Sequence, residues 1–210
     1  MCAECHSTIV KMSYDAGTDS FDTTWSEISV GCEACHGPGS THVRLADSGR
    51  EGGVYGLEVD LDDRGGAAWV MNPETGIAAR SEVRTQPPQQ PEACGRCHAR
   101  RGIIAPEYDY GEPLAHTHLP ALLDEGLYFA DGQILDEVYV YGSFLQSAMY
   151  HQGVTCTDCH DPHTAALRLE GNLTCSPCHL PGHFDTPEHH FHPQDSAGAA
   201  CVACHMPART

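Results

Sequence analysis

Six copies of the pattern Cys-x-x-Cys-His occur in this 210-residue chain, and together they use all twelve of its cysteines. Two thiols three positions apart can form thioethers to the two vinyl groups of one porphyrin, and the adjacent imidazole then lies under the iron as its proximal ligand. The pattern therefore predicts six covalently bound haem c groups, on motifs that we number 1 to 6 in chain order. The predicted thioether cysteines are Cys2, Cys5, Cys32, Cys35, Cys94, Cys97, Cys156, Cys159, Cys175, Cys178, Cys201 and Cys204, and the predicted proximal iron ligands are His6, His36, His98, His160, His179 and His205.

Zinc ribbons and disulfides are the alternative uses of paired cysteines. Neither needs a histidine directly after the second cysteine of each pair, and here all six pairs have one. Haem attachment is therefore favoured over both alternatives.

The composition provides little material for an ordinary apolar core. The chain has 21 glycines and 14 prolines, and aromatic residues make up 7%. Porphyrins would supply the missing apolar interior. We expect one mainly α-helical domain over residues 1–210, with much irregular structure and a few short β-hairpins, whose core is the haem stack. Haems 1 and 2 would lie in residues 1–45, a haem-free insertion in 46–92, and haems 3 to 6 in 93–210.

Local patterns predict several elements around the motifs. A histidine-free hairpin is expected near Trp69, and Gly37-Pro38-Gly39 should end a helix sharply. The other expected elements are a loop over Tyr14–Thr24, a helix over Trp25–His36, an extended linker over Gln86–Pro91, a hairpin over Leu127–Leu135 and a helix over Asp136–Gln152.

The formal net charge is −18, and each haem would add two propionates. Nucleic acid and anionic membrane surfaces are therefore disfavoured as partners, and redox proteins or extracellular electron acceptors are expected instead. Arginine pairs with carboxylates in fork geometry, so propionates and plain solvent are equally reasonable partners for the arginines near the motifs. These are Arg44, Arg96, Arg100, Arg101 and Arg168.

The sequence also indicates where in the cell the protein is found. No run approaches the roughly 20 apolar residues of a membrane span. Haem c is attached on the outer side of the cytoplasmic membrane in bacteria and archaea, so we expect an exported protein, periplasmic, extracellular or at the cell surface. Met1 is followed at once by Cys2, which leaves no room for a signal peptide. We therefore expect this sequence to be a piece of a longer chain.

Fifteen histidines exceed the six proximal positions by nine, which predicts bis-histidine coordination of most irons. His42 and His163 follow motif histidines across proline-containing turns and should reach neighbouring irons. In Glu112–Pro120, two histidines two positions apart would point the same way in an extended segment. The favoured distal ligands are His42, His118, His163, His189, His190 and His192; His116, His151 and Met149 are alternatives, and His183 is expected at the surface.

Several runs around the motifs resemble multihaem cytochromes. They are Met1-Cys-Ala-Glu-Cys-His-Ser-Thr, Trp25-Ser-Glu-Ile with Cys-Glu-Ala-Cys-His-Gly-Pro-Gly-Ser-x-His, Asp131-Gly-Gln-Ile-Leu-Asp-Glu-Val-Tyr and Gly153-Val-Thr-Cys-x-Asp-Cys-His-Asp-Pro-His. The chain is similar to the superfamily that includes the tetrahaem electron acceptor of hydroxylamine oxidoreductase, and especially to members fused to tetratricopeptide repeats. The resemblance implies a further haem motif upstream and helical repeats downstream. The resemblance also implies that the distal iron ligands are His42, His118, His163 and the His189–His192 cluster, whereas His151 and His183 fall outside the pattern.

Two functions are compatible with these patterns. The first is an electron conduit through closely packed haems, at the cell surface or in a filament; surplus histidines would even permit a homopolymer in which one subunit ligates a haem of the next. The second is a multihaem reductase or oxidase of small nitrogen or sulfur compounds. In the nitrite-reducing branch of the resembled superfamily, lysine commonly replaces the motif histidine at the open iron, whereas here every motif ends in histidine. We therefore favour the conduit and expect no enzymatic activity.

The haem count is the first testable prediction. Intact mass spectrometry of the protein, denatured and extracted with acidified acetone, should show six haem additions because thioether bonds survive both treatments. Fewer than six additions, or stoichiometric zinc, would contradict the interpretation of the motifs.

Overall fold

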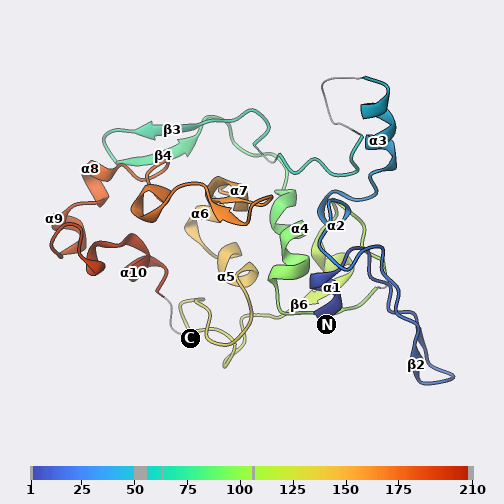
Figure 1. The fold of residues 1–210 in the computed structure, drawn as a ribbon. Helices are drawn as coiled ribbons and strands as arrows, with labels where there is room; N and C mark the ends of the chain where they lie inside the picture. Colours follow the sequence, from blue (N-terminus) through green and yellow to red (C-terminus); the bar gives the residue numbers. More distant parts are fainter. Residues whose placement is uncertain (1, 50–55, 63, 106, 208–210) are drawn as a thin grey trace.

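A computed structural model describes residues 2–49, 56–62, 64–105 and 107–207 of the chain (Figure 1). Met1 and part of the predicted insertion, residues 50–55 and 63, lie outside the described residues. The α-helices are α1 (Cys2–His6), α2 (Glu33–His36), α3 (Ser40–Asp47), α4 (Gln89–His98), α5 (Tyr141–Leu145), α6 (Ala148–His151), α7 (Cys156–Cys159), α8 (Pro181–Phe184), α9 (Pro187–His190) and α10 (Cys201–His205). The 3-10 helices are η1 (Leu114–His116), η2 (Gly171–Thr174) and η3 (Ala197–Ala199).

Within the residues that the structure describes, the strands form four separate antiparallel pairs: β1 (Tyr14–Asp15) with β2 (Ser20–Phe21), β3 (Trp69–Asn72) with β4 (Ile77–Arg80), β5 (Arg101–Ile103) with β6 (His118–Pro120), and β7 (His160–Asp161) with β8 (Ala166–Leu167). The predicted fold class, mainly helical with irregular segments and small hairpins, is confirmed. None of the helices in the described ranges is long and apolar enough to cross a membrane.

Helix α4 lies at the centre of the molecule, between an N-terminal and a C-terminal region (Figure 1). The carboxylate of Glu92 accepts hydrogen bonds from the Leu114 backbone N–H (2.7 Å) and the Tyr141 hydroxyl (3.2 Å). Leu114 itself is fully buried. Glycine is needed at position 95, because a Cβ there would lie 2.7 Å from the Tyr141 ring and 2.9 Å from Leu114. This close packing joins α4 to η1 and α5.

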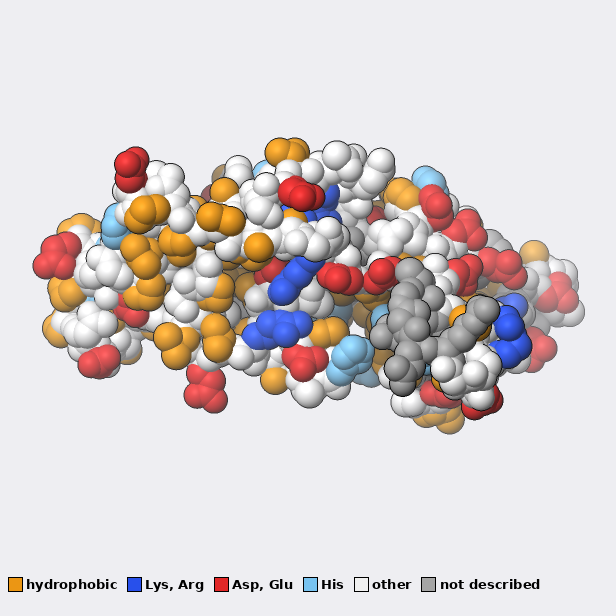
Figure 2. Space-filling model, turned by 90° about the horizontal axis from the view of Figure 1, so that it is seen from above, with side chains coloured by type: hydrophobic (Ala, Val, Ile, Leu, Met, Phe, Trp, Pro, Cys, Tyr) orange, Lys and Arg blue, Asp and Glu red, His pale blue; other side chains and the backbone are white. Residues whose placement is uncertain are grey.

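The polypeptide covers little of its own apolar surface. Its accessible area is 13847 Å², whereas a compact monomer of 22.7 kDa exposes roughly 9,500 Å². Figure 2 shows hydrophobic side chains exposed above the β3–β4 hairpin and the C-terminal helices, and Val70 and Ile77 are among the exposed residues there. The buried hydrophobic side chains of the described ranges are Val59, Ala78, Ala99, Leu114, Tyr128, Val138, Val154 and Ala199. The side chains of the described ranges therefore form only a small apolar core.

The β3–β4 hairpin was predicted, but it does more than fill an insertion. The Trp69 indole N–H donates to the Asp158 carboxylate (3.1 Å) inside motif 4. The backbone N–H of Ala78 donates to the Cys178 carbonyl (2.8 Å) of motif 5, and Leu180 N–H donates to the Gly76 carbonyl (2.8 Å). The hairpin therefore holds motifs 4 and 5 along one edge.

Four local predictions were wrong in extent. The segment Tyr14–Thr24 is not a plain loop but contains the β1–β2 pair. The residues that flank it are also paired, because Thr8 and Glu27 form an antiparallel β-bridge. That pairing keeps Trp25 and its neighbours extended, so the predicted helix over Trp25–His36 shrinks to α2, which Gly37 (φ 74°) ends as expected. Tertiary pairing overrides helix propensity here.

The other two errors concern helix boundaries. The predicted helix over Asp136–Gln152 begins only at Tyr141, after Tyr139 with φ 59°. It is then split into α5 and α6 at Ser147, whose side chain accepts from the Tyr150 N–H as a new N-cap. The predicted linker over Gln86–Pro91 becomes helical from Gln89, where Pro91 is tolerated in the first turn. The predicted hairpin over Leu127–Leu135 exists as a single antiparallel bridge between Tyr128 and Ile134.

Gly95→Ala tests the central packing. Alanine normally favours a helix by about 0.5–1 kcal/mol over glycine, but the clash with Tyr141 and Leu114 should reverse the sign and destabilise the haem-loaded protein by about 1–3 kcal/mol. The control is Gly182→Ala in α8, where a Cβ meets nothing within 4 Å among the described residues. Guanidinium unfolding followed by circular dichroism measures both, and equal effects at the two sites would contradict the packing argument.

Candidate haem-binding sites

The motifs adopt the local geometry that haem attachment needs. Motifs 1, 2, 3 and 6 end short α-helices, motif 4 forms α7 with its histidine in β7, and motif 5 is a turn after η2. Residues three apart on one helical turn face the same side, so the two thiols of a motif can reach one porphyrin. All twelve cysteines lie in the described residues, and each is a free thiol rather than half of a disulfide.

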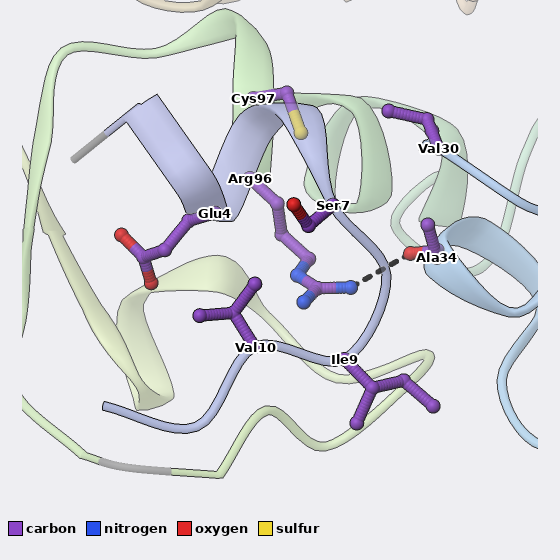
Figure 3. A pocket seen from close by; sticks show the side chains of 8 residues that line it. All are labelled: Glu4, Ser7, Ile9, Val10, Val30, Ala34, Arg96 and Cys97. Carbon is purple, nitrogen blue, oxygen red and sulfur yellow. Dashed lines mark hydrogen bonds between the residues drawn. The ribbon is translucent and has the colours of Figure 1, made fainter. Parts of the chain in front are cut away.

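Motifs 1, 2 and 3 are packed together around Arg96 (Figure 3). The Arg96 guanidinium donates to the Ala34 carbonyl (2.7 Å) of motif 2 and lies 4.1 Å from the Tyr108 ring centroid. Arg101 pairs with the Glu4 carboxylate of motif 1 at 3.1 Å, and both side chains are largely buried. The small pocket between these motifs is lined by Glu4, Ser7, Ile9, Val10, Val30, Ala34, Arg96 and Cys97.

Motif 3 lies against motif 4 as well. Hydrogen bonding to the Cys156 thiol, followed by burial, raises the pKa of Cys94 well above its usual value. The Gln90 side chain, which is buried, donates to the Thr157 hydroxyl (2.9 Å) and accepts from the Thr157 backbone N–H (3.0 Å). The two motifs are therefore in direct contact, although 62 residues separate their first cysteines.

Motifs 4, 5 and 6 also lie near one another. Burial, followed by the Asp158 carboxylate and the Cys159 thiol, raises the pKa of Cys178 to about 11. The Cys201 pKa is also raised, by burial and then by the Cys175 thiol. Asn172 joins the last two motifs, because its amide donates to the Ala199 carbonyl (2.9 Å) and accepts from the Cys201 N–H (2.8 Å).

The donor set fits haem c better than zinc. Zinc sites use thiolates and imidazoles that converge on one point. No group of three or more Cys, His, Asp and Glu side chains is placed to hold a metal ion in the described ranges. The Nδ1 atom of His36 is buried without a hydrogen-bond partner in the structure. Separate Cys-x-x-Cys-His turns suit thioether formation and single-histidine ligation.

The predicted distal histidines fall into different settings. His163, in the loop of the β7–β8 hairpin, has its ring centroid 6.4 Å from that of His36, and the rings are 18° from parallel. His189 and His205 are related in the same way, at 6.1 Å and 4°. The structure thus brings two of the favoured distal histidines opposite proximal histidines of other segments. Their ligation of iron stays a prediction.

The other histidines are placed as follows. His118 is buried beside Arg101 and Arg96, and burial followed by these charges lowers its pKa to about 4, so it is neutral as a ligand must be. The prediction that His116 and His118 point the same way is wrong, because His116 ends η1, is exposed and lies 3.7 Å from the Glu112 carboxylate. His42 lies half-buried in α3, and the alternatives His151 and Met149 are exposed in α6.

In the His189–His192 cluster, the backbone N–H of His192 donates to Nδ1 of His190 (3.2 Å), and the His192 ring stands against Gly198. His183 is exposed as expected, but its ring lies close to Gly76 of the β3–β4 hairpin. Phe184 was not singled out from the sequence, although its ring makes edge-to-face contacts with His179 (5.6 Å) and His189 (5.4 Å). The available signal in the sequence was the position of Phe184 in His-Leu-Pro-Gly-His-Phe, a run that begins with His179 and has His183 next to the Phe.

Four of the five arginines suggested as propionate partners already have protein partners. Arg96 and Arg101 connect motifs as described, Arg100 pairs with Asp136 at 2.7 Å, and Arg168 donates to the Thr157 carbonyl (2.6 Å). Their propionate role stays a prediction, as does that of Arg44.

Glu4→Gln tests the contact between motifs 1 and 3. The change leaves the buried Arg101 guanidinium without a counter-charge, which should cost about 3–5 kcal/mol of unfolding free energy in the haem-loaded protein. Asp136→Asn is the matched control, because it breaks an ion pair whose side chains are about half exposed and should change stability little. Guanidinium titration compares the two; a larger loss for Asp136→Asn would contradict this assignment.

Comparison with known proteins agrees with this geometry. A family model described as cytochrome c554 and c-prime matches residues 1–37, which contain motifs 1 and 2. No curated protein and no solved structure matches the chain. The family match supports a c-type cytochrome with covalently bound haem c and a role in electron transfer.

Proposed function

We propose that the chain is a hexahaem cytochrome that relays electrons through closely packed, mostly bis-histidine haems. The observation that carries the proposal is the series of contacts that joins the motifs. Motif 3 contacts motifs 1, 2 and 4, the β3–β4 hairpin is hydrogen-bonded to both motif 4 and motif 5, and motif 5 contacts motif 6. Because a thioether fixes the porphyrin edge beside its cysteine, neighbouring thiols place successive haems close to one another, which rapid electron transfer requires.

A reductase or oxidase would need an iron with an open coordination position. Every motif supplies a proximal histidine, and two further histidines face proximal ones at the ring distances given above. These features support closed coordination and favour the relay over catalysis, because the axial ligands largely decide what a haem can do.

The setting of the relay follows from its chemistry and charge. The protein is proposed to be exported, to the periplasm or the cell surface, and to exchange electrons with redox proteins or extracellular acceptors. A net charge of −18 before any propionate favours partners with basic docking surfaces. Filament formation and fusion to tetratricopeptide repeats are finer proposals that rest on the resemblance to repeat-fused cytochromes and on the surplus histidines.

Reductive titration and carbon monoxide test the relay together. The titration curve should be broad, because neighbouring haems shift one another's potentials as each gains an electron. The reduced protein should bind less than one equivalent of carbon monoxide, and it should not turn over nitrite, hydroxylamine or tetrathionate. Catalytic reduction of one of these substrates, abolished by cyanide at a single haem, would instead establish the enzyme.

A further inference from the structure

Two pairs of histidine rings have a separation that two axial ligands of one iron would share. His36 and His163 lie 6.4 Å apart between centroids, and His189 and His205 lie 6.1 Å apart, with planes inclined by 18° and 4°. Parallel rings in direct face-to-face contact would be closer than this.

The spacing matches two imidazoles on opposite faces of one iron. A metal–imidazole nitrogen bond is about 2.0 Å long and the ring centroid lies about 1.1 Å beyond the nitrogen, so the two centroids should be roughly 6.2 Å apart. Both measured distances fall within a few tenths of an ångström of this value. The agreement holds for a loop–helix pair and for a helix–helix pair, so one local structure does not produce both.

The backbone holds each added histidine in place. In the β7–β8 hairpin, Ala165 adopts φ 57° and the Asp161 carboxylate accepts from the His163 backbone N–H (3.0 Å), which fixes the loop. His189 lies in α9, where Phe184 contacts both its ring and that of His179. Each ring is therefore positioned by its own segment rather than by contact with its partner.

We propose that His163 is the distal ligand of the haem on motif 2, and that His189 is the distal ligand of the haem on motif 6. This assignment rests on the proposed hexahaem function and adds which iron each histidine serves. One short hairpin would then carry the proximal ligand of haem 4, His160, and the distal ligand of haem 2. Haem 2 would consequently be tied to the segment of motif 4, in addition to its contact with motif 3.

The ring geometry also selects within the C-terminal cluster. Among His189, His190 and His192 in the described structure, His189 is the one whose ring lies opposite a motif histidine. His190 accepts from the His192 backbone, and the His192 ring stands against Gly198. His190→Ala and His192→Ala should therefore leave haem 6 low-spin.

The test counts high-spin haems by electron paramagnetic resonance and absorption spectroscopy, in protein whose haem content is verified by intact mass. His163→Ala and His189→Ala should each convert one haem from low-spin to high-spin, with all haems retained, and added imidazole should restore the low-spin state. His183→Ala is the control and should be silent. The lost signals should be rhombic, as expected for near-parallel ligand planes, rather than the strongly anisotropic signals of perpendicular planes.

Haem-deletion backgrounds identify the iron. In Cys32→Ala/Cys35→Ala protein, which lacks haem 2, His163→Ala should add no high-spin haem, whereas in Cys201→Ala/Cys204→Ala protein it should add one. His189→Ala should show the reverse. A new high-spin haem in the matching background would overturn that assignment.

If a deletion background does not fold, His36→Met or His205→Met replaces it. Each should give the charge-transfer band of a His–Met haem, and the matching His163→Ala or His189→Ala should abolish that band; a band that persists would overturn the pairing. Carbon monoxide binding and turnover by the unmodified protein test the relay separately. The relay can therefore fail while the ligand pairs hold, or the reverse.

Discussion

Covalent attachment of a porphyrin to one turn of chain is the constraint on which this structure depends. A Cys-x-x-Cys-His turn needs no long helix, and the helices of the described ranges are accordingly short, with α4 the longest at ten residues. The polypeptide exposes far more surface than a compact protein of its mass, and its own buried apolar cluster is small. The arrangement of the molecule is therefore described better by which attachment turns contact one another than by layers of helices and sheets.

That arrangement is maintained by polar contacts between motifs rather than by apolar packing. Contacts of Arg101 with Glu4, of Gln90 with Thr157, and of Asn172 with the backbone of Cys201 each join the segments that carry two motifs, through partly or fully buried groups. Removing one partner of such a contact leaves the other unsatisfied, which costs more than the contact itself contributes. Because hydrogen bonds and ion pairs are directional, these polar contacts fix the relative position of neighbouring motifs, whereas apolar surfaces would allow several positions.

The sequence predicted what is local and missed what is long-range. The attachment turns, the stop at Gly37 and the β3–β4 hairpin follow from spacing and turn chemistry within a few residues. The helix expected from Trp25 failed because Thr8 pairs with Glu27, and no local pattern encodes that pairing. The central place of motif 3 could not be predicted either, since motif spacing says nothing about which turns meet in space.

The same distinction applies to the histidines. Counting them predicts bis-histidine coordination, and a turn after His160 predicts that His163 points away from its own iron, but neither selects the iron that it reaches. The facing of His163 and His36 depends on how the β7–β8 hairpin docks beside α2. A chain whose histidines bridge separate motifs gains rigidity at each bridge, because both axial bonds of one iron then fasten two segments that no hydrophobic core holds together. With the proposed ligand pairs, closed coordination and structural stability would have a common source, and opening an iron for catalysis would remove one of the bonds that hold two segments together.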